Sequence, residues 1–364
     1  MPWRALAVCT ALCLPEAGCS SRQTPVRQSP GASLPTAVGG SLSPQGVNGF
    51  SEGLARVELN GRHGFIDRNG QVAISPQFAR AQSFCDGMAL IWDGGRCGWI
   101  DKNGKIAIEA AYPEARDFRE GLAAVRVGQR WGFIDLSGKM AIEPEYEAAD
   151  VGFFEGLAGV QVNGRWGFID KQGKLVIPAR YDDAQHFAGT GLAPVLEGTL
   201  WGYIDRTGTF VIEPQFVSAT TFFGDPPIAF AAAHPIGRGP IGCIDASGRW
   251  VFRSPPGVQC GPFTEGLCVG YTFVGAQWLG GYLDIGGRWT VSPRFEWAGA
   301  FSEGLANVRL PGGSVGYIDK TGAIVIRPQF AEGQRFSEGR ARVRIGNSCG
   351  YIDRTGKWIW TPTK

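Results

Sequence analysis

One short signature recurs nine times along the chain and limits what the chain can fold into. Each copy reads Gly, a residue that is aromatic in eight of the nine copies, Ile or Leu, Asp, two variable residues and Gly. The first copy begins at Gly64 and the last at Gly350, and successive copies begin 34 to 40 residues apart. A near-constant period of this length is typical of small supersecondary units that bury their apolar faces against their neighbours. We therefore predict one repeat domain over residues 49–364.

The sequence pattern of a single unit predicts a three-stranded antiparallel meander. The Phe-Arg-Glu-Gly-Leu segment of residues 118–122 is interpreted as a turn, and residues 123–127, 131–135 and 139–143 are interpreted as strands. The Asp-x-x-Gly segment between the last two strands predicts a hairpin turn whose Gly has a positive φ. Pro144 is expected to end the sheet, because proline cannot donate a ladder hydrogen bond.

The composition agrees with an all-β chain, since 55 Gly, 22 Phe and 12 Trp accompany only 3 Met. We predict an all-β fold, a tandem array of nine such meanders that stack on one another as an open superhelix. The chain stops just past a third strand near Trp360, so no spare strand is evident to complete a closing unit. The alternative is a closed, propeller-like ring.

The first 48 residues differ from the repeats. Residues 1–18 hold one cation, a short apolar stretch and small residues before Cys19, which predicts a signal peptide that resembles those of bacterial lipoproteins. Cys19 is then the expected site of lipid attachment, and residues 19–48, rich in Ser, Pro and Gly, are expected to form a flexible tether. This predicts an exported protein of the cell envelope, lipid-anchored to a membrane. A periplasmic or secreted protein is the alternative.

No constellation of catalytic residues stands out. His63, His186 and His234 occupy unrelated positions in their units, and no metal-binding, nucleophile or phosphate-loop spacing is present. The nine signature Asp residues are interpreted as acceptors of turn amides rather than as calcium ligands, because each unit supplies only one. The net charge of +2 includes no basic run of the kind that binds nucleic acid. We expect no enzyme activity, metal, cofactor or nucleic-acid partner.

Other residues recur at fixed places and are interpreted as structural. A Phe is expected to fill the gap between neighbouring units, and a Glu is expected to pair with Lys or Arg at the hairpin tips. The alternative for the cations is a basic stripe that binds an anionic glycan or lipid. The Phe residues are 50, 84, 118, 153, 187, 263, 301 and 336, the Glu residues are 52, 120, 155, 265, 303 and 338, and the cations after the turn Gly are Lys105, Lys139, Lys174, Arg249, Arg288 and Lys357.

The Arg-Trp-Gly-Phe-Ile-Asp stretches at residues 130–135 and 165–170 resemble the WG-repeat family. The likeness covers residues 50–364, although Trp precedes the signature Gly only at Trp131, Trp166 and Trp201. The resemblance implies a β-rich bacterial repeat protein, often surface-exposed, and it supplies no catalytic residues to carry over.

The candidate site lies where the repeat is irregular, over residues 217–281, because longer loops on a rigid scaffold often carry binding residues. Arg238, Phe273 and Trp278 are the candidate binding residues there. In an exported chain, Cys85 with Cys97 and Cys260 with Cys268 are candidate disulfides, and buried free thiols are the alternative.

The predicted function is a non-enzymatic, monomeric scaffold that binds a protein or glycan of the envelope. A purely structural envelope component is the alternative, and an envelope hydrolase is a more distant one.

Overall fold

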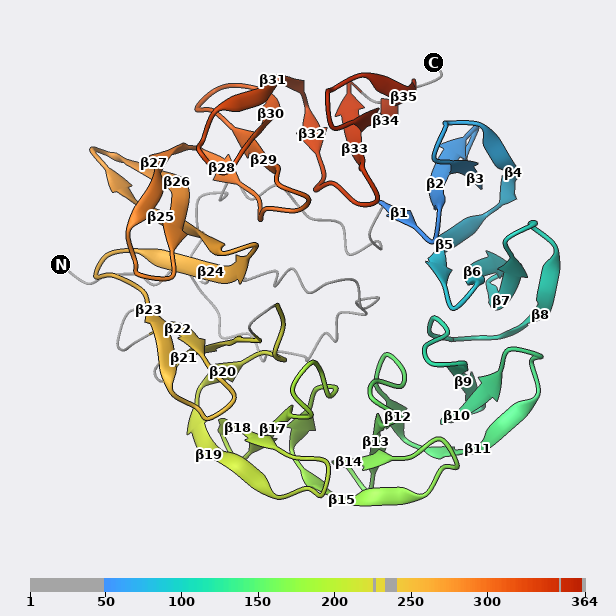
Figure 1. Ribbon diagram of the computed structural model, residues 1–364. Coiled ribbons are helices and arrows are strands. Elements are labelled where there is room, and N and C mark those ends of the chain that lie inside the picture. Colours follow the sequence, from blue (N-terminus) through green and yellow to red (C-terminus); the bar gives the residue numbers. More distant parts are fainter. Residues whose placement is uncertain (1–48, 225–226, 233–240, 347, 362–364) are drawn as a thin grey trace, which may run out of the picture.

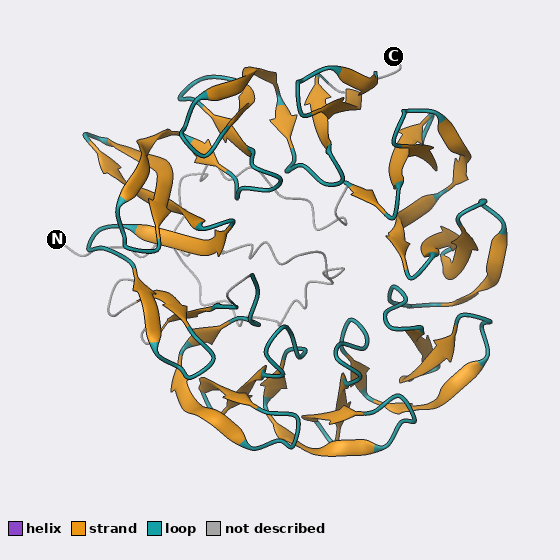
Figure 2. Ribbon diagram, viewed as in Figure 1, coloured by secondary structure: helices purple, strands orange, loops and turns teal. Residues whose placement is uncertain are grey.

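The structure is a computed structural model that describes residues 49–224, 227–232, 241–346 and 348–361. The described residues form 35 strands in nine small antiparallel sheets, each made of strands that are consecutive in the chain. Figure 1 shows the sheets following one another around a circle, so that the first and last sheets are neighbours. Loops and turns connect the strands (Figure 2). The described residues form no helix, and so none that could span a membrane.

The sheets are numbered in chain order. The first three contain β1 (Phe50–Ser51), β2 (Leu54–Leu59), β3 (Arg62–Asp67) and β4 (Val72–Phe78); β5 (Arg80–Cys85), β6 (Met88–Asp93), β7 (Arg96–Asp101) and β8 (Ile106–Tyr112); and β9 (Leu122–Val127), β10 (Arg130–Asp135) and β11 (Met140–Tyr146). The next three contain β12 (Ala148–Ala149), β13 (Ala158–Val162), β14 (Arg165–Ile169) and β15 (Leu175–Tyr181); β16 (Asp183–Ala184), β17 (Ala193–Glu197), β18 (Leu200–Ile204) and β19 (Phe210–Phe216); and β20 (Ser218–Ala219), β21 (Ala229–Ala232), β22 (Ile241–Ile244) and β23 (Trp250–Arg253). The last three contain β24 (Gln259–Thr264), β25 (Leu267–Val274), β26 (Gln277–Asp284) and β27 (Trp289–Phe295); β28 (Trp297–Ala298), β29 (Ala306–Arg309), β30 (Val315–Ile318) and β31 (Ile324–Phe330); and β32 (Glu332–Gly333), β33 (Arg340–Ile345), β34 (Ser348–Asp353) and β35 (Trp358–Trp360).

The prediction of an all-β repeat array is confirmed, but the unit has one more strand than predicted. Eight of the nine sheets have four strands, because a first strand, often only two residues long, pairs with the second. In the third sheet this strand is reduced to isolated bridges such as Ala115 with Val125. The extra strand was missed because a two-residue pairing leaves no periodic pattern in the sequence.

The outermost strand also continues past its proline. β11 runs to Tyr146, so Pro144 does not end the sheet as predicted. Proline is tolerated because this strand is at the edge of its sheet, where one row of backbone groups has no partner strand. A register shift between Trp131 and Phe133 accompanies it.

The signature Gly is explained by this irregular edge. A Cβ atom at Gly167 would lie 2.6 Å from the carbonyl oxygen of Ile177 and 2.7 Å from the amide nitrogen of Ala179. Similar clashes with the outer strand occur at seven other signature Gly residues, for example at Gly64 and Gly132. Only glycine allows the outer strand to cross so closely over the third strand.

The core consists of nine clusters, most of which join two consecutive sheets. In eight interfaces the aromatic residue of the signature packs against the Phe of the next unit, with ring centroids 4.7 to 5.4 Å apart. The pairs are Phe65–Phe84, Trp99–Phe118, Phe133–Phe153, Phe168–Phe187, Tyr203–Phe222, Tyr282–Phe301, Tyr317–Phe336 and Tyr351–Phe50. These pairs confirm the predicted role of seven recurring Phe residues, whereas the eighth, Phe263, packs against Phe252, and Phe222 was not predicted.

The last of these pairs shows that the array is closed. Tyr351 of the ninth sheet and Phe50 of the first belong to one buried cluster, with Ala55, Val57 and Ile66. The expectation of an open superhelix is wrong, and the closed, propeller-like alternative is what the structure shows. The expectation failed because it assumed that closure needs a shared strand, whereas here side chains alone join the first and last sheets.

We predict that Gly167→Ala destabilises the fold strongly, by about 3 kcal/mol, because its Cβ has no room beside the outer strand. Gly159→Ala is the matched control in the same unit, since its Cβ would make only ordinary contacts of 3.5 Å or more. Denaturant unfolding of both variants tests this, with a change below about 1 kcal/mol expected for Gly159→Ala. Equal effects of the two substitutions would contradict the explanation of the signature.

Candidate functional site

The signature Asp residues cap their own turns. In the first unit, Oδ1 of Asp67 accepts the backbone N–H groups of Asn69 and Gln71, both at 2.8 Å. The same pair of bonds recurs in other units, for example at Asp101 and Asp170. Backbone hydrogen bonding from Lys105 lowers the pKa of Asp101, which keeps its carboxylate ionised. The interpretation of these residues as turn acceptors is confirmed.

The recurring Glu-Gly turn joins the first two strands of a sheet, and at most interfaces its side chain also contacts a neighbouring sheet. Glu52 and Gly53 both have positive φ, 53° and 88°, as the two central residues of a type I′ hairpin turn. This conformation costs a non-glycine residue about 1–2 kcal/mol. Glu is nevertheless used because its carboxylate reaches the neighbouring unit, where it accepts the N–H of Gly87 at 3.1 Å.

We call this bond the turn carboxylate contact: the acid of one Glu-Gly turn accepts the N–H of the Gly in the next turn. Six interfaces have it within the described residues. The bonds are Glu52 to Gly87, Asp86 to Gly121, Glu120 to Gly156, Glu265 to Gly304, Glu303 to Gly339 and Glu338 to Gly53. The role of Asp86 was missed from the sequence because Asp replaces Glu there.

Cations complete these contacts, but they are not the ones predicted. The partner is the residue directly after the signature Asp of the next unit, as in Lys102 Nζ to Glu52 Oε2 at 3.0 Å. Lys171 and Lys320 lie in the same way against Glu120 and Glu265. The cations after the turn Gly do not supply these pairs. Arg249 and Arg288, for instance, pair with the Asp of their own turns.

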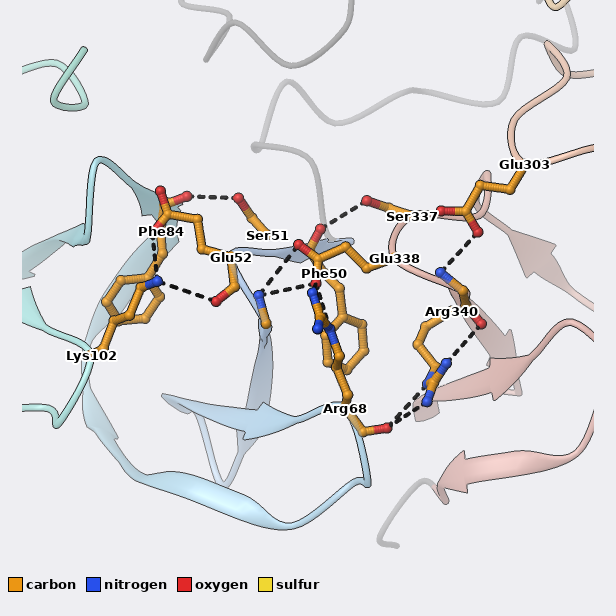
Figure 3. A network of polar contacts seen from close by, with 12 residues as sticks. Phe50, Ser51, Glu52, Arg68, Phe84, Lys102, Glu303, Ser337, Glu338 and Arg340 are labelled. Atoms are coloured by element: carbon orange, nitrogen blue, oxygen red, sulfur yellow. Dashed lines mark hydrogen bonds and ion pairs between the residues drawn. The ribbon is translucent and has the colours of Figure 1, made fainter. Parts of the chain in front are cut away.

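The interface between the first and ninth sheets, which we call the seam, repeats this arrangement (Figure 3). Glu338 accepts the N–H of Gly53 at 3.0 Å and the Nε–H of Arg68 at 2.8 Å. Ser337 Oγ donates to the carbonyl of Phe50 at 2.8 Å, and the Arg340 guanidinium donates to the carbonyl of Arg68. The bonds of Glu338 and Ser337 therefore repeat those between consecutive units, such as Glu52 with Gly87 and Ser51 with Phe84, whereas the Arg340 bonds occur at the seam alone among the described interfaces.

The series of contacts is interrupted on the other side of the ring. The fifth unit has Gly189-Thr190-Gly191 in place of the Glu-Gly turn, and no turn carboxylate contact occurs between the fourth and seventh units in the part that the structure describes. At the interface of the sixth and seventh sheets, Cys243 replaces the signature aromatic, and Phe252 packs against Phe263 instead. The irregular region of the sequence is thus also the least regular part of the ring.

Within that region, two of the three candidate binding residues lie together. Phe273 and Trp278 face each other across the β25–β26 hairpin, with ring centroids 4.7 Å apart. Each strand of this hairpin has eight residues, against six in β2 and β3, so its tip extends about 7 Å further. Phe273 is 66% exposed, more than any other large hydrophobic residue in the described part of the chain. Arg238 lies outside the described residues.

The cysteine predictions have different outcomes. All six described cysteines are free thiols. In the strand register, Cys85 of β5 lies opposite Met88 of β6, and Cys97 of β7 lies opposite Trp92 of β6. Met88 and Trp92 are four residues apart, so the two cysteines are separated by about 13 Å along β6, well beyond disulfide reach. Their predicted disulfide is wrong. The Cys260 and Cys268 thiols are hydrogen-bonded to each other in the cluster that also contains Cys243, and their oxidation stays a prediction. Cys19 lies outside the described residues.

Two of the three histidines lie within the described residues, and they belong to units that are not neighbours in the ring. His63 is in β3, and His186 stacks on Phe154 with ring centroids 4.0 Å apart. Burial lowers the pKa of His186 to about 4, so it is neutral at physiological pH. His234 lies outside the described residues. Among those residues, no group of three or more His, Cys, Asp or Glu side chains is arranged to hold a metal ion.

Comparison with known proteins agrees with this geometry. The model of the WG containing repeat matches residues 64–95, 98–131, 131–166, 166–198, 201–231, 281–312 and 316–349, and thus leaves residues 232–280 unmatched. No curated protein matches the chain.

Solved structures show the same kind of fold at low identity. A eukaryotic initiation factor has a TM-score of 0.57 and 9% identity, over 85% of this chain and 99% of the other. BamB from Moraxella catarrhalis has a TM-score of 0.41 and 13% identity, over 83% and 95% of the two chains. Both structural neighbours are propeller-like. The initiation factor, which has the higher TM-score, supports the ring fold and nothing beyond the fold.

We predict that Glu338→Ala lowers the free energy of unfolding by about 1–2 kcal/mol, because it removes a charged acceptor from the seam. Glu213→Ala, which removes an exposed carboxylate from the outer strand β19, is the matched control and is expected to have little effect. Denaturant unfolding measures both. If the two variants are equally stable, the turn carboxylate contact contributes nothing at the seam.

Proposed function

The chain belongs to the WG-containing repeat family, and we propose that its ring is a non-enzymatic scaffold that binds an envelope protein or glycan through the β25–β26 hairpin. The observation that carries the proposal is the aromatic pair at the tip of that hairpin, in which Phe273 is mostly exposed and Trp278 is half-buried. Phe273 and Trp278 are held in a fixed mutual geometry on a paired two-stranded element. Such a tip can reach a partner without rearrangement of the ring.

Physical reasons support recognition by this tip. Leaving a Phe side chain two-thirds exposed forgoes much of the roughly 1.5–3 kcal/mol that its burial would provide. Aromatic side chains are enriched among the residues that contribute most to binding, and they also stack on the apolar faces of sugars. Val274 continues the apolar surface at the tip and is 45% exposed. Together these side chains form a small apolar surface on a rigid support.

The location of the protein is part of the same proposal. The sequence before residue 49 supports export and a lipid anchor at Cys19, which would place the ring at a membrane surface, joined by residues 19–48. A periplasmic or secreted protein without the anchor is the alternative.

We expect that Cys19→Ala moves the protein from the membrane fraction to the soluble fraction of the producing cells, because acyl chains would no longer be attached. Cys85→Ala, which replaces a cysteine within the repeat domain, is the control and should leave the protein in the membrane fraction. Cell fractionation with metabolic labelling by a fatty acid measures both. Equal fractionation and no label in the unchanged protein would contradict the anchor.

Site-specific photo-crosslinking tests the binding surface. A photoreactive residue at Phe273 should give a discrete adduct in the native envelope, and the same residue at Val72, which is 51% exposed in the first sheet, should not. Protease and glycosidase treatment of the adduct then identifies its class. No adduct, or the same adducts from both positions, would favour the purely structural role.

A variant separates binding from folding. Phe273→Ser should abolish the adduct formed by a photoreactive residue at Trp278 while changing stability by less than about 0.5 kcal/mol, because the side chain is mostly in solvent. Ile285, which is 49% exposed, lies in the turn just past the other end of β26, and Ile285→Ser should leave the adduct unchanged.

A further inference from the structure

A cavity of about 220 Å³ lies at the seam. Its walls come from β2 and β3 of the first sheet and from β33, β34 and β35 of the ninth. The cavity is thus formed by the two ends of the repeat domain, and it exists only while the ring is closed.

The cavity results from two substitutions in the repeat. The position before the signature Gly holds Trp131 and Trp166 in the third and fourth units, and both are buried. In the ninth unit the same position holds Cys349, whose smaller side chain leaves space at the seam that an indole would fill, and in the first unit it holds His63. Both residues line the cavity.

A second pair of substitutions makes the cavity basic. In each unit one residue of the second strand lies directly opposite the aromatic residue of the signature. In most units this residue is uncharged, as with Ala124, Gly159 and Leu90. Only in the first and ninth units is it a cation, as Arg56 lies opposite Phe65 and Arg342 opposite Tyr351. Two guanidinium groups are thereby placed in one cavity between neighbouring sheets.

Two polar side chains of the cavity, those of Arg342 and His63, have atoms without a partner among the described residues. Arg56 Nη1 donates to the carbonyl of Ala81 at 2.6 Å. The side chain of Arg342 has no hydrogen bond or ion pair among the residues described, and Nδ1 of His63 is buried without a hydrogen-bond partner. Glu58, which is exposed and lies opposite His63 in the β2–β3 pair, is the one carboxylate in the lining. Cationic groups therefore outnumber it.

The electrostatics of the cavity favour an anion. Burial lowers the pKa of Arg56, and the charges of Arg342 and Arg80 act in the same direction, whereas Tyr351 and Glu58 act in the opposite direction. Burial also lowers the pKa of His63, with a further contribution from Arg56. The protein itself thus holds like charges together at a partly buried place, and a bound anion would relieve their repulsion.

We propose that the seam cavity binds a small phosphate-bearing molecule, with Arg342 and Arg56 as cationic partners and Nδ1–H of His63 as a further donor. Guanidinium groups suit the several oxygens and the double charge of a phosphate group, and two of them match that charge better than the single charge of a carboxylate. Trp360, at the edge of the cavity, offers an apolar surface for an organic substituent. Because the ligand contacts both ends of the domain, it stabilises the closed ring.

Thermal unfolding of the full-length protein tests the proposal, with inorganic phosphate as the probe and sodium chloride at equal ionic strength as the reference. Phosphate should raise Tm in a saturable manner, and Arg342→Gln should weaken the apparent affinity by about tenfold or more. Arg96→Gln is the matched control, because Arg96 is exposed in the second sheet and, among the described residues, donates only to the carbonyl of Ala111. No shift in the unchanged protein, or the same shift in Arg342→Gln, would overturn the proposal.

A second measurement needs no variant. Cys349 lines the cavity, whereas Cys85, which is also partly exposed, lies in the second sheet. Phosphate should slow the alkylation of Cys349 by iodoacetamide, a neutral reagent, and leave the rate at Cys85 unchanged, as read by mass spectrometry. Equal slowing at both cysteines, or none at Cys349, would contradict binding in the cavity. Equal protection by acetate would assign the cavity to carboxylates and overturn the phosphate proposal.

Discussion

The ring depends on the contact between an aromatic side chain of one sheet and a phenylalanine of the next. A four-stranded sheet of this size is marginally stable alone, because it has too little apolar surface to offset the entropy lost on folding. Each aromatic pair contributes about 0.5–1.5 kcal/mol beyond its buried area, and it does so only when two sheets meet. Stability therefore belongs to interfaces rather than to units, and an array with open ends would leave Phe50 on one side and Tyr351 on the other exposed to water.

Closure follows from repetition of one interface around a circle. The Glu-Gly turn, the aromatic pair and the turn Gly all act between neighbouring units, and the seam has each of them: Glu338 bonds to Gly53, Tyr351 packs on Phe50, and Gly70 approaches the backbone of Ile359. No strand has to be exchanged between the ends, since the ninth interface has the same turn carboxylate contact and aromatic pair as five other interfaces. Where the repeat is altered, as at Cys243, the interface is repacked with different side chains instead.

Much of this fold was predictable from the sequence, because the signature marks both its turn and its strands. The Asp turns, the strand pairs and the burial of the recurring Phe residues all follow from spacing and residue type. Closure was not predictable in this way, since the bond from Glu338 to Gly53 joins residues at opposite ends of the domain and depends on the summed rotation of nine units. The seam cavity was missed for the same reason: Arg56 and Arg342 show no relation to each other until the ring brings them together.

The central claim, that the first and ninth units are joined as neighbours are, is tested most directly by zero-length carbodiimide cross-linking of an Arg68→Lys variant. The amine introduced at position 68 would then lie against Glu338, as Lys102 lies against Glu52 and Lys320 against Glu265 in the unchanged chain. Mass spectrometry of the monomer should find the link between Glu338 and position 68 together with the two internal links, at comparable yield. Formation of both internal links without the one across the seam would show that the ring is open in solution.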